Sequence, residues 1–176
     1  MSASKYILNP NFIHKVLEEK GEICQTCGDN TNTAIKLVVP LEFGGKQELN
    51  NVIVLCRRCS IISDLGKNLK MNDTTISINF WVSHQLYKDI ENLIGKNYQK
   101  SMGALVRYLI SNYLTHPSMY QDMERYQSSG SDIKVNVKVD VDVYADFKIC
   151  MEERGITITD AIKALICIYK DEVSTT

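Results

Sequence analysis

The C-terminal part of this 176-residue chain contains one pattern twice, a strand followed by two helices. The aligned positions are Val82 with Val139, Leu86 with Val143, Tyr87 with Tyr144, Ile90 with Phe147 and, after an offset of one residue, Ser101 with Thr157, Val106 with Ile162, Arg107 with Lys163, Ile110 with Ile166 and Tyr113 with Tyr169. A single copy cannot bury its apolar faces, and a lone strand leaves its backbone groups unpaired. We therefore expect the two copies to fold against each other.

The first copy begins with residues that alternate between apolar and polar. This alternation over residues 76–82 predicts a strand with one buried face. Ser83 is a typical helix N-cap, and the apolar residues after it follow helical spacing as far as a predicted turn at 95–100. Ser101 is placed to cap a second helix, which a His-Pro step ends.

The second copy repeats this order. Valines alternate with polar residues over 133–139, which predicts another half-buried strand. Asp140 is placed to cap the helix that follows, and Gly155 is placed to end it. Thr157 then precedes a last apolar stretch at helical spacing, so we expect it to cap a fourth helix.

Pairing of the two strands would give an antiparallel ribbon with one face on a helical core and the other in solvent. The predicted outer face consists of Ser77, Asn79, Trp81, Lys134, Asn136 and Lys138. A two-stranded ribbon fits the major groove of B-DNA, where Asn pairs with adenine and Lys donates to guanine. The N-termini of the second helices, at Ser101 and Thr157, would offer N–H groups to flanking phosphates. We therefore expect these eight residues to contact double-stranded DNA.

Both copies resemble the ribbon-helix-helix repressors, whose subunits consist of a strand, a helix and a second helix capped by Ser or Thr. The matching segments are ISINFWVSHQLYKDIENLI (76–94), SMGALVRYLISNYL (101–114), IKVNVKVDVDVYADF (133–147) and TITDAIKALICIYK (157–170), and the two units that contain them span about half of the chain. The family acts as dimers of identical chains, so the tandem copy implies a single-chain pseudo-dimer that is able to self-associate further. The resemblance implies a sequence-specific transcription regulator, expected to be a repressor. The tandem arrangement is similar to that of regulators from archaeal viruses, which implies a viral protein in the host cytoplasm.

A plainer interpretation of the strand face stays open. The net charge of the chain is −1, so it lacks the basic excess of many nucleic-acid binders. In this interpretation the C-terminal part is an amphipathic α+β domain, and the polar residues of its strands are solvated without binding DNA. In that case Trp81 would pack against the N-terminal domain or the neighbouring strand.

Four of the six cysteines form two C-x-x-C pairs, Cys24 with Cys27 and Cys56 with Cys59. In a reducing compartment such pairs are usually metal ligands. Four thiolates are the ligand set of a closed tetrahedral zinc site, so we expect a structural Zn²⁺. The remaining cysteines lie within helical patterns and are expected to be small buried apolar residues.

The segment AIKLVVPLEFGGKQELNNVIVLCRRC (34–59) resembles the HNH endonucleases, which have a zinc-stabilised ββα core. The matching features are the Pro40-Leu41 step, the Gly44-Gly45 loop, Asn51 and the Val54-Leu55 approach to the last cysteine pair. In that family an Asp-His pair shortly before the Pro activates water and helps to hold the catalytic metal. Lys36 and Leu37 occupy those places here, and Ser60 replaces the His or Asn expected after the final Cys.

The three histidines of the chain, His14, His84 and His116, all lie outside the HNH-like motif. Because leucine can neither accept a proton nor bind a metal, we predict that the chain is not an enzyme. The HNH-like domain would be a scaffold for folding, for protein contact or for auxiliary DNA contact. The basic residues available for such a contact are Lys36, Lys46, Arg57 and Arg58, and a solvated surface is the equal alternative.

Together the patterns predict an α+β protein with four parts: an HNH-like zinc-binding domain (1–70), ribbon-helix-helix units (75–115 and 132–172) and a polar linker between them (116–131). The first residues lack the order of a secretory signal, and no apolar run approaches the roughly 18 residues of a membrane span. We therefore expect a cytoplasmic protein without membrane contact.

Two other functions stay open at this point. One is an HNH-type DNA endonuclease whose catalytic residue is displaced. The other is an antitoxin-like protein, in which the ribbon binds DNA and another segment neutralises a toxin. The sequence after Tyr169 is only KDEVSTT, so the second role would fall to the N-terminal domain.

Overall fold

The parts of the chain that the computed structural model describes are residues 8–66, 74–96, 101–126 and 132–174. Internal contacts divide the protein into two compact units, Met1–Asn68 and Leu69–Thr176. Each unit combines helices with a two-stranded antiparallel sheet, so the protein is mixed α+β, as predicted. Within the described ranges, no helix is both long enough and apolar enough to cross a bilayer.

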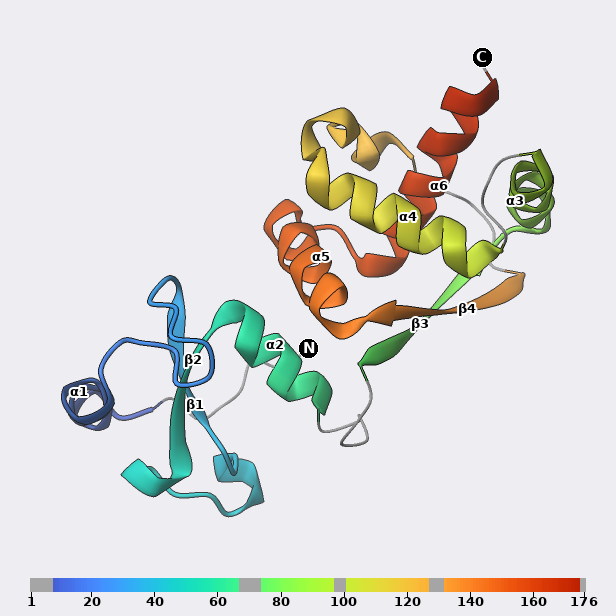
Figure 1. The fold of residues 1–176 in the computed structure, drawn as a ribbon. Coiled ribbons are helices and arrows are strands. Elements are labelled where there is room, and N and C mark those ends of the chain that lie inside the picture. The colour runs from blue at the N-terminus through green and yellow to red at the C-terminus, as the bar shows by residue number, and fades with distance from the viewer. Residues whose placement is uncertain (1–7, 67–73, 97–100, 127–131, 175–176) are drawn as a thin grey trace. The chain divides into compact units, whose positions relative to one another are not determined.

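The N-terminal unit combines a β-hairpin with two helices (Figure 1). Its elements are α1 (Pro10–Lys20), β1 (Thr33–Leu37), η1 (Leu41–Phe43), η2 (Leu49–Asn51), β2 (Val52–Cys56) and α2 (Arg57–Gly66), where η marks a 3-10 helix. Helix α1 begins after Asn9, whose side chain accepts a hydrogen bond from the Asn11 N–H. The helix ends at Gly21, where φ is 71°, a value that glycine adopts without strain.

Strands β1 and β2 pair antiparallel and pack against α1. Val16, Val52 and Val54 form the fully buried centre of this small core. Asn51 holds the loop between the strands, because its side chain bonds the N–H and C=O of Val39 and the C=O of Lys46 at 2.8–3.0 Å. The chain order of this unit's second half is therefore strand, strand, helix, with a tightly held loop between the strands.

The C-terminal unit contains both copies of the sequence repeat. Its elements are β3 (Thr75–Val82), α3 (His84–Lys96), α4 (Met102–Thr115), η3 (Pro117–Tyr120), η4 (Met123–Arg125), β4 (Ile133–Asp140), α5 (Val141–Arg154) and α6 (Ile158–Ser174). Each copy thus forms one strand and two helices, as the sequence predicts. Helix α3 extends through Lys96, so residues 95 and 96 of the turn predicted at 95–100 are helical, and residues 97–100 lie outside the described part.

Strands β3 and β4 form an antiparallel ribbon in which Asn79 lies opposite Asn136. Burial alternates along both strands, so every second side chain faces the helices and those between them face solvent. The four helices lie on one side of this ribbon (Figure 1). The predicted strand pairing and the predicted inward face are therefore confirmed.

Each of the four helices of this unit begins directly after the residue predicted to cap it. The Ser83 and Ser101 hydroxyls accept hydrogen bonds from the N–H groups of Leu86 and Ala104. In the second copy, the side chains of Asp140 and Thr157 accept from Asp142 and Asp160 in the same way. Helix α5 ends at a left-handed glycine, Gly155, with φ of 69°.

The core of this unit lies between the ribbon and the helices. Its largest fully buried side chains include Phe80 of β3, Ile90 of α3, Leu109 of α4, Phe147 of α5 and Ile166 of α6. Side chains from the ribbon and from all four helices therefore belong to one continuous core. Because both sequence copies contribute, neither copy has a separate core of its own.

The connection between the two copies is more ordered than a polar linker. In residues 116–126, Tyr120 and Met123 are buried in the core, although the surrounding residues are polar. The Tyr120 hydroxyl accepts a hydrogen bond of 2.6 Å from Asn112 of α4, and Arg154 of α5 donates to the Tyr120 and Gln121 carbonyls. The segment therefore joins the ends of α4 and α5. The remaining residues of the predicted linker, 127–131, lie outside the described part of the chain.

Candidate metal centre and candidate nucleic-acid interface

Cys24, Cys27, Cys56 and Cys59 lie together in the N-terminal unit, and their Sγ atoms are all within 4.8 Å of one another. The first pair precedes β1, and the second pair spans the end of β2 and the first turn of α2. The Cys27 and Cys56 Sγ atoms are 3.7 Å apart. Ligands of a tetrahedral zinc ion, each about 2.3 Å from the metal, are about 3.8 Å from one another. The cluster is therefore arranged to hold a metal ion.

The environment of the cysteine cluster affects the ionisation of its thiols unequally. Burial opposes ionisation of Cys24, but hydrogen bonds from the surrounding backbone outweigh it and lower the pKa of this thiol to about 6. Burial and the neighbouring sulfur atoms raise the pKa of Cys59. The first thiolate thus forms readily, whereas a bound cation would be needed to ionise all four.

Lys36, one of the two residues that replace the expected Asp-His pair, forms an ion pair within the N-terminal unit. Lys36 on β1 contacts Asp64 of α2 through Nζ and Oδ1 at 2.6 Å, and it also donates to the Ser60 carbonyl at 3.2 Å. The Lys36 ammonium group is therefore engaged by partners within the N-terminal unit. For this reason Lys36 is a poor candidate for the auxiliary DNA contact that the sequence left open.

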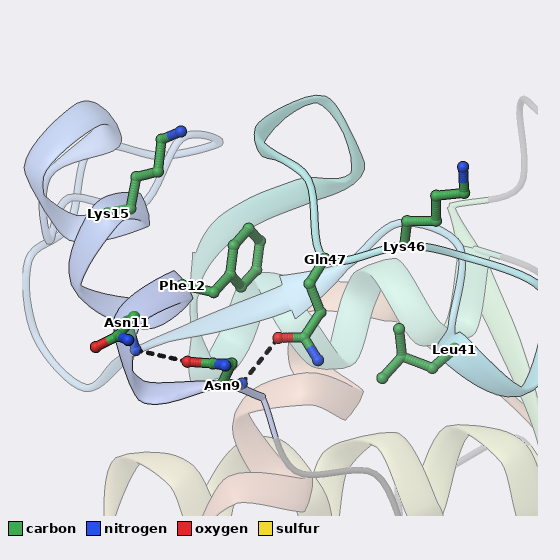
Figure 2. Close-up of a pocket in the computed structure, with 7 residues that line it drawn as sticks. All are labelled: Asn9, Asn11, Phe12, Lys15, Leu41, Lys46 and Gln47. Atoms are coloured by element: carbon green, nitrogen blue, oxygen red, sulfur yellow. Dashed lines mark hydrogen bonds between the residues drawn. The ribbon is translucent and has the colours of Figure 1, made fainter.

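A shallow groove runs between α1 and the loop that follows β1. It is lined by Asn9, Asn11, Phe12, Lys15, Leu41, Lys46 and Gln47 (Figure 2). Gln47 holds the start of α1 by accepting a hydrogen bond of 2.8 Å from the Asn9 N–H. The groove contains none of the four cysteines. Lys46, another candidate for auxiliary DNA contact, lies here together with Lys15, while Arg57 and Arg58 lie in the first turn of α2.

The six predicted strand residues share the solvent face of the β3–β4 ribbon. They are Ser77, Asn79, Trp81, Lys134, Asn136 and Lys138, and all are exposed. Trp81 is 46% exposed, so its ring is not buried within its own unit. The structure therefore brings together the residues that the sequence placed on one face.

The centre of this outer face is an asparagine pair. The Asn136 side-chain amide donates a hydrogen bond of 3.0 Å to Oδ1 of Asn79. The strand register places Ser77 opposite Lys138 at one end of the face and Trp81 opposite Lys134 at the other. The outer face thus has one lysine at each end and two carboxamides between them.

The two predicted phosphate-binding helix ends differ from each other. At α4, the first turn carries no acidic residue, and Arg107 one turn later donates to the Lys138 carbonyl at 3.0 Å. At α6, the Thr157 hydroxyl donates to the Asp160 carboxylate at 2.6 Å. Because that carboxylate occupies the first turn of α6, the positive end of this helix dipole is already partly compensated.

Arg107 and Asp160 were not among the residues predicted from the sequence to contact DNA. The spacing of Thr157 and Asp160, three residues apart at a helix start, is the signal that could have indicated their pairing. The contact of Arg107 joins residues 31 positions apart in the chain, so no local pattern could indicate it.

Comparisons of the chain with protein-family models, with curated proteins and with solved structures found no match.

Proposed function

We propose that this protein is a sequence-specific double-stranded DNA-binding transcription regulator, with a single-chain ribbon-helix-helix pseudo-dimer as its reading module. One observation carries the proposal: an antiparallel ribbon backed by four helices presents only polar side chains and one tryptophan to solvent. An isolated two-stranded ribbon is only marginally stable in water, but this one is supported by its core. Its outer side chains therefore have a rigid backbone from which to contact a ligand.

The chemistry of the outer face suits the major groove. The groove is about 12 Å wide and admits a two-stranded ribbon. The carboxamides of Asn79 and Asn136 match the donor and acceptor pattern of adenine, and the ammonium groups of Lys134 and Lys138 match the acceptors of guanine. Phosphate contacts at the start of α4 would position the ribbon without reading sequence. Occupying a promoter in this way would make the protein a repressor.

In the N-terminal unit we propose a structural zinc site. Sulfur-only ligation with four protein ligands leaves no open coordination position for a substrate, which favours a structural role. The order of β1, β2 and α2 around the cysteine pairs supports descent from an HNH-like scaffold. Lys36, paired with Asp64, is not available to activate water there. We therefore propose that the unit is not a nuclease and instead supports DNA binding or protein contact.

Replacing Asn136 or Lys138 by alanine is expected to weaken discrimination between the target sequence and unrelated DNA by about 1–3 kcal/mol for each variant. The reason is that each side chain would lose its contact with a base edge, while the exposed position leaves folding unchanged. Gel-shift titration with target and unrelated duplexes measures this ratio.

The matched controls for this experiment are Asn92→Ala and Lys88→Ala. Both remove the same chemical groups from exposed positions on helix α3. This helix covers the inner face of the ribbon and not the face proposed to contact DNA. The controls are expected to retain the discrimination of the unchanged protein. Equal affinity of all four variants for the target would contradict the proposed role of the ribbon.

The endonuclease alternative has a direct test. The protein is incubated with supercoiled plasmid and Mg²⁺, Mn²⁺ or Ni²⁺, and the expected result is intact plasmid. This expectation depends on the absence of a proton acceptor at Lys36 and Leu37. Nicking that disappears in a Cys56→Ser variant would instead support a nuclease with a displaced catalytic residue.

A further inference from the structure

The outer face of the ribbon departs from the symmetry of the fold that carries it. Equivalent strand positions of the two copies are 57 residues apart, as in Val82 and Val139. By this offset Asn79 is equivalent to Asn136, and these two residues also lie directly opposite each other in the ribbon. The pseudo-two-fold axis that relates the copies therefore passes between them, at the centre of the outer face.

On either side of this axis the equivalent residues differ in chemistry. Ser77 is equivalent to Lys134, and Trp81 is equivalent to Lys138. Across the ribbon, one end therefore presents a hydroxyl beside an ammonium group, and the other presents an indole beside an ammonium group. Both ends can donate to guanine, but only the tryptophan end offers a large apolar surface suited to a thymine methyl group.

The central asparagine pair is also directional. Because Oδ1 of Asn79 accepts the hydrogen bond from Asn136, the Asn79 amide nitrogen keeps both of its donors. Asn136 has used one donor, and its Oδ1 has no partner among the hydrogen bonds of the pair. The two carboxamides thus present a donor on one strand and an acceptor on the other. An adenine-thymine pair offers acceptor, donor and acceptor in a row, so it accommodates this order in both orientations, and the ends of the face have to supply the distinction.

The flanking helix ends add to this asymmetry. Arg107 contacts the Lys138 carbonyl, so α4 packs beside the serine end of the face and brings a first turn without acidic residues. Helix α6 instead begins with the Thr157 and Asp160 pair. A phosphate would therefore be attracted more strongly to the N-terminus of α4 than to that of α6.

We propose that the protein recognises a non-palindromic DNA site in a single orientation, with the difference between Ser77/Trp81 and Lys134/Lys138 determining that orientation. This inference rests on the proposed function and specifies its substrate. A symmetric ribbon would instead select inverted repeats, because two identical half-faces read identical half-sites. The backbone of this module has the two-fold symmetry of an inverted repeat, but the side chains of its outer face lack that symmetry.

The test is selection of bound duplexes from random DNA with the full-length, metal-loaded protein and with a Ser77→Lys/Trp81→Lys double variant. The double variant gives both strands the same order of lysine, asparagine and lysine. We expect the unchanged protein to enrich a non-palindromic sequence and the double variant to enrich an inverted repeat. On synthetic duplexes, each protein is expected to prefer its own site by about tenfold or more, the range expected for one changed base contact.

A Gln85→Lys/Asn92→Lys variant is the control for added positive charge. It places the same two lysines at exposed positions of α3 and leaves the ribbon unchanged, so it is expected to keep the non-palindromic preference. An inverted repeat enriched by the unchanged protein would overturn the inference while leaving the proposed function standing. Enrichment of the original non-palindromic site by the Ser77→Lys/Trp81→Lys variant would overturn the inference in the same way. A library without any enriched sequence would contradict the proposed function itself.

Discussion

Removing the metal with a chelator is expected to unfold the N-terminal unit while the C-terminal unit stays folded. Among its described residues, the N-terminal unit has two small buried clusters, one of Val16, Val52 and Val54 and the other of Cys24, Leu55 and Cys56, so burial alone contributes little stability. Binding of a structural zinc ion contributes about 10–16 kcal/mol in small zinc-binding peptides, which is similar in size to the total stability of a domain. The C-terminal unit has a separate and larger core that contains no metal cluster among its described residues.

Hydrogen exchange followed along the chain measures this result. After chelation, the amides of β1, β2 and α2 are expected to lose protection, whereas those of β3, β4 and helices α4–α6 keep it. A Cys24→Ser/Cys56→Ser variant should behave as the chelated protein does, with loss of bound zinc. Cys150→Ala, which alters a cysteine outside the cluster, should retain one zinc per chain. Full protection of β1 and β2 after complete loss of zinc would contradict the structural role of the metal.

Truncating Phe147 to alanine is expected to destabilise the C-terminal unit by about 3–5 kcal/mol. The side chain is fully buried and meets the Tyr113 ring edge to face, with 5.6 Å between ring centroids. Tyr113 belongs to the first copy of the repeat and Phe147 to the second, so the cavity would lie where the two copies pack against each other. Since the total stability of a domain is about 5–15 kcal/mol, this loss would be a large part of it.

Urea denaturation measures the change in the free energy of unfolding. Trp81 is the only tryptophan of the chain and lies in β3, so its fluorescence follows the C-terminal unit separately from the N-terminal one. Ser77→Ala, at an exposed position on the same ribbon, is the control and is expected to change stability by no more than about 0.5 kcal/mol. A Phe147→Ala variant as stable as this control would show that the two copies do not share one core.

Local patterns predicted the elements of the C-terminal unit well. Alternation over 76–82 and 133–139 identified both strands and the side chains that face solvent. Hydrogen-bonding side chains at Ser101 and Thr157 identified the helix starts, because an N-cap interacts with residues only three positions away. In the N-terminal unit, the spacing of the two cysteine pairs predicted a cluster that the fold assembles. The predicted DNA contacts stay predictions.

Other features depend on contacts that no local pattern encodes. The burial of Tyr120 and Met123 in an otherwise polar connection follows from the core surface available to them, not from their neighbours in sequence. The pairing of Lys36 with Asp64 joins residues 28 positions apart, and it changes a candidate DNA contact into an internal ion pair. In each case the interacting partners are distant in the sequence and come together only in the tertiary structure.

The sequence by itself determined which side chains each strand turns away from the helices, since alternation is a property of the extended backbone and needs no partner strand. Only the tertiary structure decided how the two strands align. Their register follows from the joint packing of both copies in one core, and a shift of one residue would turn every side chain to the opposite face. That register places Asn79 beside Asn136 and leaves unlike residues at the two ends of the face.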